Sequence, residues 1–424
     1  TIGDSHNTIA VEANPVDGSI HMLYDMHAYS QASYPDDFFN YSVSKNGVAQ
    51  ITDGEFDLSL FFPKRNYLKR GEDYDRATYP EIQAAPNGQM IVRYRLGGAG
   101  NGDIIFSSYE AGAWGAPYRF SDGTIPLPDR YSLYGSERFI RGRLHAGFSV
   151  RYAQNPAYAL NSGLHYAYAD APYGPDNWRD IDGNPVSIPF GAPDALRVGT
   201  PEDDHGTADA PRTAQGPHFT VTAAGDIHFV TRVDNRNVHY WRAAGQQAFQ
   251  SAVGGEILRP DGYLFDYGEY VVATGLINDR VVIRAARGGT NDWETLYQQQ
   301  GGAEYDHFNG IVSDDQLLLY AMREASSDAR PLHLLQFQLS GGTTSVNAPT
   351  REAPRVFPNP TTGRLSIDVG GTDAPYQLYD LGGRLLKSGN VDGRLLQLDG
   401  YAAGVYLLRV RTSSGWAARR IVLH

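Results

Sequence analysis

The sequence predicts an all-β protein, with a β-propeller over residues 1–345 and a small β-sandwich over residues 355–424. Three observations predict this fold class. A turn rich in Gly, Asn or Asp, followed by a strand of alternating character, recurs six times before residue 345. Tyrosine and glycine are abundant, and no convincing long helix interrupts the strands. Blade-sized repeats with regular turn signals are typical of propellers.

The six repeated units are of blade size, at about 57 residues each if they divide residues 1–345 evenly. Their real spacing is uneven, which predicts insertions, best placed at 64–78 and 192–215. A β-sandwich is the structural rival, although six similar units would need more than one sandwich. The turns that open the units are Asp17-Gly18, Asn87-Gly88, Gly142-Arg143, Gly225-Asp226, Asn278-Asp279 and Asp314-Asp315.

The composition supports many short strands and excludes several kinds of chemistry. The 28 tyrosines and 47 glycines suit strands joined by tight turns. The absence of cysteine excludes disulfides, thiol nucleophiles and cysteine-ligated zinc. No apolar run approaches the roughly 20 residues of a membrane helix, so no membrane span is expected. The polar opening Thr1-Ile2-Gly3-Asp4 shows no signal peptide, so we expect either that a leader was removed or that the given sequence begins late.

The formal net charge of −12 argues against a general nucleic-acid binder. An anionic glycan is still compatible with this charge, because a local field can oppose the global one. Five basic residues fall close together before Tyr79, where they form either a solvated loop or an electrostatic funnel for a polyanion. They are Lys64, Arg65, Lys69, Arg70 and Arg76.

Four side chains near the start carry the chemistry needed to cleave a uronate-containing glycan by β-elimination: His6, His27, Tyr79 and Arg95. Arginine stays charged and pairs with a carboxylate through two hydrogen bonds, which makes the C5 proton of the sugar more acidic. Histidine and tyrosine can take that proton and protonate the leaving oxygen. Because the innermost strands of a propeller line one funnel, residues distant in sequence can converge there.

Other residues have more ordinary interpretations. Arg93 and Arg95 point the same way on a strand, so either could clamp the carboxylate. The segment from Gly97 to Asp103 is glycine-rich but lacks a βαβ context, so it indicates a tight turn that lets a sugar approach the backbone. Three histidines recur at one place in the repeat and are expected to be structural: His21, His145 and His228. A second group of histidines and aspartates matches no standard metal-ligand spacing. It consists of His205, His218 and His239 with Asp203, Asp204 and Asp209.

Four short segments resemble the BNR-repeat propeller lyases that include the ulvan lyases. The segments are Ser5-His6-Asn7, Tyr24-Asp25-Met26-His27, Thr78-Tyr79-Pro80, and Arg93-Tyr94-Arg95 with the Gly-Asn-Gly-Asp that follows. The resemblance is strongest over residues 3–110. It implies an active centre of His6, His27, Tyr79 and Arg95, in which Arg95 neutralises the uronate carboxylate. His6 and Tyr79 are then the base and acid pair and His27 supports or shares one role, while the identity of the base stays open.

The resemblance also implies a seven-bladed propeller, of which six blades are readable here, because relatives carry a further blade before the His-Asn segment. Substrate binding is expected at Asn7, Lys64, Arg65 and Arg93. No cofactor is expected to be required, with a structural calcium ion as an option whose ligands the sequence leaves open. A cysteine-ligated structural metal, as in some relatives, is excluded.

The last 70 residues have a different character. Residues 346–354 are predicted as a linker, within a stretch rich in Gly, Thr, Ser, Pro and Ala. The Phe-Pro-Asn-Pro-Thr-Thr-Gly opening at 357–363 and the Gly-Val-Tyr-Leu-Leu-Arg-Val strand at 404–410 resemble the C-terminal sorting domain of the type IX secretion system of Bacteroidetes. The resemblance implies that the secretion machinery is a partner and that the protein is secreted or attached to the cell surface.

The leading functional hypothesis is a lyase acting on ulvan, a sulfated polymer of rhamnose and uronic acid. Three alternatives stay open: a lyase on another rhamnose–glucuronate glycan, a sialidase-like hydrolase, and a non-catalytic glycan-binding propeller. Loosely Asp-box-like turns at 170–178 and 289–293 fit a sialidase as well, but His6 and His27 have no place in one.

Overall fold

The computed structural model describes residues 6–51, 56–123, 130–153, 161–206, 214–234, 236–254, 263–313, 315–323, 330–339, 355–359, 361–368, 374–379, 384–391, 395–398, 400–412 and 415–423. The chain divides into two compact units, the first ending at Thr344 and the second holding the C-terminal residues from Ser345 onward. Within the described ranges, no helix combines the length and the apolar character needed to cross a membrane.

The described part of the first unit contains six antiparallel sheets, which follow one another in chain order. The first sheet consists of β1 (Ile9–Ala13), β2 (Ile20–Tyr24) and β3 (Tyr41–Val43). The second consists of β4 (Ala77–Ala84), β5 (Met90–Gly98), β6 (Asn101–Glu110), β7 (Ala113–Trp114) and β8 (Tyr118–Arg119). The third consists of β9 (Tyr131–Ile140), β10 (Arg143–Tyr152), β11 (Asn161–Ala169), β12 (Trp178–Arg179) and β13 (Arg197–Gly199).

The later three sheets are built in the same way. The fourth consists of β14 (Ala214–Val221), β15 (Ile227–Val233), β16 (Arg236–Arg242) and β17 (Gln250–Val253). The fifth consists of β18 (Leu264–Tyr267), β19 (Tyr270–Ile277), β20 (Arg280–Arg287) and β21 (Glu294–Gln298). The sixth consists of β22 (Tyr305–Ser313), β23 (Gln316–Arg323) and β24 (Leu332–Gln338). The described helices are short: α1 (Pro201–His205) and 3₁₀ turns at Val48–Gln50, Leu58–Leu60, Pro175–Asn177 and Pro193–Leu196.

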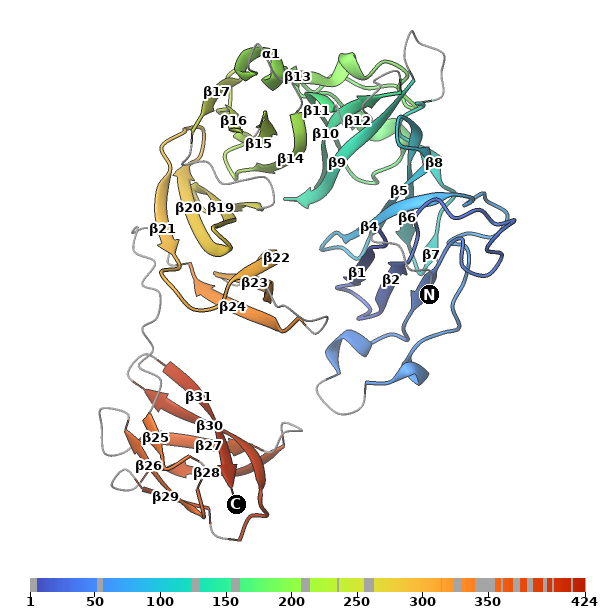
Figure 1. The fold of residues 1–424 in the computed structure, drawn as a ribbon. Helices are drawn as coiled ribbons and strands as arrows, with labels where there is room; N and C mark the ends of the chain where they lie inside the picture. The colour runs from blue at the N-terminus through green and yellow to red at the C-terminus, as the bar shows by residue number, and fades with distance from the viewer. Residues whose placement is uncertain are drawn as a thin grey trace. The chain divides into compact units, whose positions relative to one another are not determined.

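The six sheets are arranged around a ring, as the blades of a propeller are (Figure 1). The predicted β-propeller is therefore confirmed. The described residues form six such sheets, which is also the number of repeats read from the sequence. The seventh blade implied by the family resemblance stays a prediction.

Five of the turns predicted from the sequence join two neighbouring strands of one sheet, whereas Asp314 of the sixth lies outside the described residues. The turn at Asn87-Gly88, for example, joins β4 to β5. Gly88 has a positive φ of 85°, and a side chain there would come within 2.7 Å of Val16 Cγ2, so both the backbone and the neighbouring residue require glycine. The two predicted insertions, 64–78 and 192–215, overlap the long connections before β4 and β14, and the second contains β13 and α1.

The three histidines that recur in the repeats lie inside the sheets, as their structural interpretation predicts. His21 contacts the Tyr41 hydroxyl through Nδ1 at 2.8 Å. His145 contacts the Tyr166 hydroxyl at 2.6 Å. His228 Nδ1 lies 2.9 Å from His239 Nε2. All three rings are at most 4% exposed, so they are core residues with satisfied hydrogen bonds.

The second unit is a β-sandwich. One sheet holds β25 (Arg355–Phe357), β26 (Arg364–Asp368) and β29 (Leu395–Gln397), and the other holds β28 (Leu385–Asn390), β27 (Pro375–Tyr379), β30 (Gly404–Thr412) and β31 (Gly415–Leu423). Buried side chains from both sheets form one core, among them Leu365, Leu378, Leu396, Leu408 and Ile421. The linker predicted at 346–354 lies outside the described residues.

Candidate active site

The four predicted catalytic side chains lie in one continuous row. The rings of His6 and His27 stack with centroids 4.7 Å apart. His27 is followed by Tyr79, with ring centroids 5.4 Å apart and Tyr79 Oη 3.4 Å from His27 Nε2. Arg95 Cζ then lies 5.1 Å from the centre of the Tyr79 ring. His6 is exposed, His27 and Tyr79 are half-buried and Arg95 is buried, so the row runs from the surface inward.

Irregular backbone aims His27 and Tyr79 at each other. His27 lies between two residues of positive φ, Asp25 at 53° and Ala28 at 56°, and pairs with Thr78 in an isolated bridge. Tyr79 itself has a φ of 51°, at the point where the register of β4 against β5 shifts. Bulges of this kind re-aim a side chain. Non-glycine residues in this region cost about 1–3 kcal/mol each and cluster at functional sites.

Arg95 is held on the central strand β5 by the hairpin that follows it. Its side chain is 5% exposed, and its buried Nε has no hydrogen-bond partner. Gly102 on β6 leaves room for the side chain, since a Cβ there would come within 2.8 Å of Arg95 Cδ. The glycine-rich segment predicted as a tight turn is therefore also the space in which the arginine stem lies.

Sequence reasoning missed two further members of the site, Tyr134 on β9 and Arg151 on β10. The Tyr134 hydroxyl accepts hydrogen bonds from Arg95 Nη1 at 2.7 Å and from Arg151 Nη1 at 3.2 Å. It donates to the Ala99 carbonyl at 3.0 Å. Arg151 Cζ also lies 4.0 Å from the centre of the Tyr134 ring, and Arg151 Nε donates to Asn161 Oδ1. One phenol thus holds two guanidinium groups together.

The charges of this arginine pair are not balanced by carboxylates in the described part of the chain, where neither Arg95 nor Arg151 forms an ion pair. Two adjacent guanidinium groups of this kind attract an anion, and their planar N–H groups fit a carboxylate. No sequence signal pointed to Tyr134 or Arg151, because both come from the next sheet and neither belongs to a repeated motif.

Arg93, predicted to bind substrate, is engaged elsewhere. Its Nη1 lies 3.1 Å from Glu81 Oε1 and its Nε 3.4 Å from Glu137 Oε1, and it is 7% exposed. Burial raises the pKa of Glu137 to about 8 and also raises the pKa of Glu81, although the Arg93 guanidinium opposes both shifts. The structure therefore places Arg93 in an internal cluster with two carboxyl groups and leaves Arg95 as the arginine next to Tyr79.

The remaining predicted binding residues lie in loops that precede or follow the strands of the first sheet in the chain. Asn7, next to His6, accepts a hydrogen bond from the Tyr29 hydroxyl at 3.0 Å. Lys64 Nζ forms an ion pair with Asp37 at 2.7 Å, which lowers the pKa of Asp37 through the hydrogen bond. The backbone of Arg65 pairs with that of Tyr41. The substrate-binding role of these residues stays a prediction.

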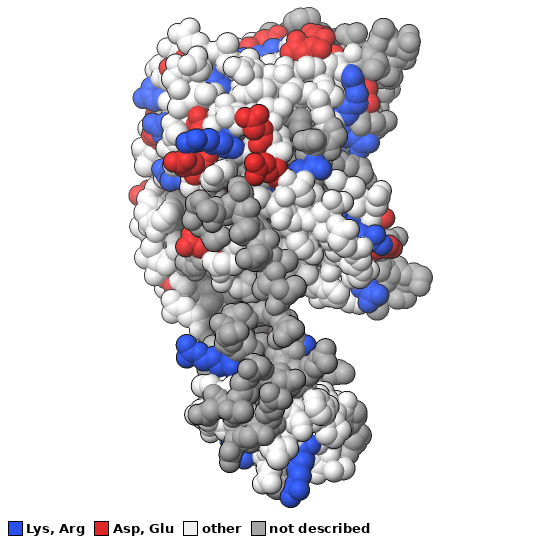
Figure 2. Space-filling view, turned by 90° about the vertical axis from the view of Figure 1, so that its left-hand side faces the viewer, with Lys and Arg blue, Asp and Glu red and all other residues white. Residues whose placement is uncertain are grey.

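Charges of both signs are mixed on one face of the molecule. On the face drawn in Figure 2, acidic and basic side chains of the described residues are interspersed and form no large basic patch.

Metal binding is not supported by any cluster in the described ranges, where no three His, Asp or Glu side chains are placed to hold an ion. His205 bonds to Ser251 Oγ at 2.9 Å, whereas His239 lies in the core against His228 and Asn291. The structural calcium ion stays a prediction without a site among these residues.

Comparison with known proteins decides the family. Residues 1–254, more than half of the chain, match the BNR repeat-containing family. The chain belongs to this family. Residues 355–424 match the secretion system C-terminal sorting domain, so both resemblances seen in the sequence are confirmed.

Among its relatives, this BNR-repeat protein is similar to ulvan lyases. It is 31% identical to the short isoform from Alteromonas sp. (strain LOR) over 78% of this chain and 70% of that protein. It is 30% identical to the long isoform from Pseudoalteromonas sp. (strain PLSV) over 87% of this chain and 40% of that protein. The chain thus spans about two fifths of the length of the long isoforms.

The propeller is also similar to a solved structure. The crystal structure of the polysaccharide lyase Uly1 aligns with a TM-score of 0.72 and 27% identity, over 80% of this chain and 79% of that one. This BNR-repeat protein therefore shares its propeller fold with a polysaccharide lyase.

Proposed function

We propose that this protein is a secreted polysaccharide lyase that cleaves ulvan by β-elimination. The observation that carries the proposal is the row of His6, His27, Tyr79 and Arg95, which ends on a pair of guanidinium groups without carboxylate partners in the described chain. Similarity to ulvan lyases and to Uly1 supports the reaction and the substrate. The sorting domain supports export, with the type IX secretion machinery as partner.

In the proposed mechanism, Arg95 and Arg151 bind the uronate carboxylate, which favours removal of the proton on the neighbouring C5. The electron pair of the C5–H bond forms the C4–C5 double bond, and the C4–O4 bond breaks. The leaving O4 takes a proton, so one base and one acid are needed. Tyr79 lies next to Arg95, and therefore next to C5 of a bound uronate, while His6 lies at the exposed end of the row.

His27 connects the two proton-transfer groups. It stacks on His6 and lies within reach of the Tyr79 hydroxyl, so it can orient both and share one proton with them. We assign His6 and Tyr79 as the base and acid pair and His27 as the group that supports them. Tyr134 has a positioning role, because it holds both arginines through its hydroxyl.

The proposal is tested by incubating the full chain with ulvan and following the ultraviolet absorbance of unsaturated uronate ends. We expect this absorbance to rise with the wild-type protein, and both His6→Ala and Tyr79→Phe to lower the rate by about 10²–10⁴-fold, the usual contribution of a general acid or base. His307→Ala is the matched control, because His307 is an exposed histidine of the sixth sheet. Both inactive variants should still bind ulvan.

Three outcomes would contradict the proposal and separate the alternatives. Unsaturated ends formed only from another rhamnose–glucuronate polymer would keep the lyase and change the substrate. New reducing ends without ultraviolet absorbance would show a hydrolase. Binding without any new ends would show a glycan-binding propeller.

A further inference from the structure

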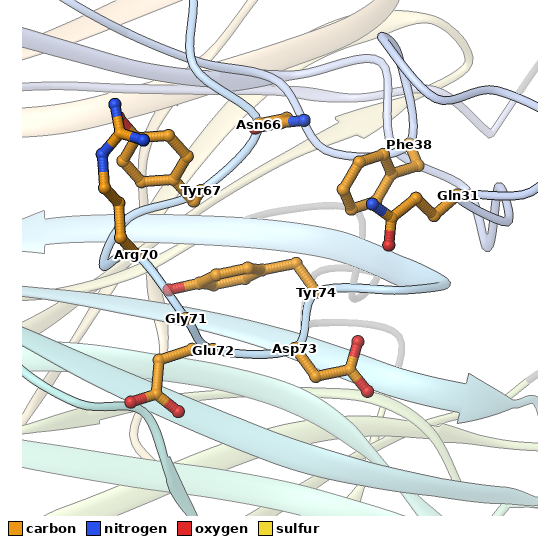
Figure 3. Close-up of a pocket in the computed structure, with 9 residues that line it drawn as sticks. All are labelled: Gln31, Phe38, Asn66, Tyr67, Arg70, Gly71, Glu72, Asp73 and Tyr74. Carbon is orange, nitrogen blue, oxygen red and sulfur yellow. The ribbon is translucent and has the colours of Figure 1, made fainter.

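A hollow of about 270 Å³ opens in the loops beside the active row (Figure 3). Its walls come from two connections, the one between β2 and β3 and the one between β3 and β4. No residue assigned to the reaction above contributes to it. The side chains used in the argument are Gln31, Phe38, Tyr67, Arg70, Asp73 and Tyr74.

The floor of the hollow is well packed. Tyr74 is 2% exposed, and its ring lies 4.5 Å from Phe39 and 5.9 Å from Tyr94, centre to centre. Its hydroxyl accepts from the Lys69 backbone N–H at 2.9 Å. Gly71, at the rim, has no neighbour within 4 Å of the position of a Cβ, so the hollow is open on this side. A packed floor with an open rim can receive a ligand without rearranging.

One end of the hollow combines a cation with an aromatic ring. The Arg70 guanidinium lies 4.7 Å over the ring of Tyr67. In the described part of the chain Arg70 forms no ion pair, and its side chain is exposed. Figure 3 shows Arg70 and Tyr67 together at one end, whereas the carboxylates of Glu72 and Asp73 point away from the guanidinium. An anionic group can therefore approach Arg70, while hydroxyl groups can reach the carboxylates.

The hollow and the row of His6, His27, Tyr79 and Arg95 share two backbone segments. The segment that starts at His27 runs antiparallel to the segment that ends at Tyr79: His27 pairs with Thr78, and the Ala28 N–H donates to the Ala77 carbonyl. Further along the same two segments, the Gln31 N–H donates to Asp75 Oδ1 at 2.5 Å. Gln31 is four residues after His27, so their Cα atoms lie at most about 14 Å apart. One polysaccharide chain can reach both places.

We propose that this hollow is a subsite for a sulfated sugar unit of the chain whose uronate lies at Arg95. This inference rests on the proposed function, since it places the same polymer in both sites. Arg70 binds the sulfate ester, and the Tyr67 ring supports the face of the sugar. Asp73 accepts hydrogen bonds from sugar hydroxyl groups, and the side-chain amide of Gln31 donates hydrogen bonds to them. The subsite makes the protein prefer sulfated polymer over the same polymer without sulfate.

The first experiment compares Arg70→Gln with wild type on ulvan and on chemically desulfated ulvan. We expect Arg70→Gln to raise KM on ulvan about 5- to 20-fold with kcat unchanged, as for the loss of one exposed charge-assisted hydrogen bond. On desulfated ulvan the variant and the wild type should have the same KM. Arg287→Gln is the matched control, because Arg287 is an exposed arginine of β20 in another sheet.

Two further variants separate charge from stacking. Arg70→Lys keeps the charge and loses the planar contact, so its KM on ulvan should lie between those of wild type and Arg70→Gln. Tyr67→Ala removes the ring and should raise KM on both polymers. An equal rise for Arg70→Gln on both polymers, or no rise on either, would overturn the subsite.

The test also works if the reaction has been assigned wrongly. Affinity electrophoresis through gels that contain ulvan measures binding without turnover. Retardation of the wild type that Arg70→Gln weakens, and Arg287→Gln does not, supports the subsite even if no unsaturated ends form. Absence of unsaturated ends contradicts only the proposed lyase, whereas equal retardation of all three proteins contradicts the subsite.

Discussion

At the scale of single residues, the site depends on how each arginine is neutralised. Arg93 and Arg95 are two residues apart on β5 and point to the same side of the sheet. Arg93 meets Glu81 and Glu137, so its charge is satisfied inside the protein. Arg95 donates to the Tyr134 hydroxyl, which Arg151 shares, and it forms no ion pair in the described part of the chain, so its charge is available to a ligand. The partners on neighbouring strands, and not the position along β5, give the two arginines different roles.

The second arginine of the site leads to a prediction about Arg151. Arg151→Gln removes a positive charge beside Arg95 but leaves the Tyr134 hydroxyl to hold Arg95. We expect kcat/KM on ulvan to fall about 100- to 1,000-fold, the range for loss of one preorganised donor to a developing charge. Steady-state kinetics by ultraviolet absorbance measure the effect. Arg151→Lys should recover only part of the loss, because an ammonium cannot bind the carboxylate through two parallel hydrogen bonds.

Full activity of Arg151→Gln would contradict the role of the arginine pair. Its thermal unfolding midpoint serves as the check on folding. A variant that unfolds like the wild type but turns over slowly supports a direct role in binding the carboxylate.

At the scale of elements, the hairpin of β5 and β6 positions Arg95. Its glycines allow two strands to approach closely, and Gly102 faces the stem of the arginine. Gly102→Ala would place a Cβ 2.7 Å from the Gly98 carbonyl oxygen and 2.8 Å from Arg95 Cδ, so backbone and side chain must both shift. We expect a loss of about 1–3 kcal/mol in the free energy of unfolding, as for overpacking, together with a loss of turnover.

Chemical denaturation and initial rates on ulvan test this prediction side by side. Gly301→Ala is the control, because no heavy atom lies within 4 Å of the position of its Cβ and its φ is not in the positive range. Gly102→Ala with wild-type turnover would show that Arg95 does not depend on the hairpin.

The buried histidines of the strands make stability depend on pH. Burial lowers the pKa of His21 and His145 to about 4, and that of His165, His228 and His239 to about 3. In the unfolded chain these imidazoles have a pKa near 6.5. Between pH 6.5 and 4 the unfolded state therefore binds more protons than the folded state. Stability is fully present above pH 6.5 and is lost as the pH falls through this window.

Each such histidine contributes about 1.4 kcal/mol per pH unit to this slope. Denaturant unfolding at several pH values between 4 and 6.5 measures the total. His145→Gln should unfold more easily at pH 7 but show a slope lower by about one proton. A slope identical to that of the wild type would indicate that His145 already carries its charge in the folded protein.

The elements show why some features could be predicted from the sequence and others could not. The six turns are local, since residues such as Asn87 and Gly88 determine their own backbone conformation. The row of His6, His27, Tyr79 and Arg95 was predicted from short motifs. Tyr134 and Arg151 join that row only through contacts between sheets, and the hollow at Tyr67 and Arg70 depends on how two long connections fold. Such contacts leave no periodic pattern in the chain.

At the scale of the whole molecule, the two units have separate cores, and the proposed function assigns them separate tasks. The described residues of the active row and of the hollow lie between His6 and Asn161, in the first three sheets and their loops. The sandwich core is formed by side chains from Val356 onward. Under the proposed function, we therefore expect the sorting domain to serve export and the propeller to carry the chemistry.

Removing residues 345–424 tests this division of tasks. Because the propeller contains its own cores and every described residue of the site, we expect kcat/KM on ulvan to stay within about twofold of the full chain, as for a domain that folds by itself. In a host with type IX secretion, the truncated protein should stay inside the cell while the full chain is exported. Enzyme assays on purified protein and fractionation of the host measure the two effects separately. If the truncated protein still unfolds cooperatively but has lost its activity, the C-terminal domain takes part in catalysis. If the truncated protein is exported, the sorting signal lies in the propeller.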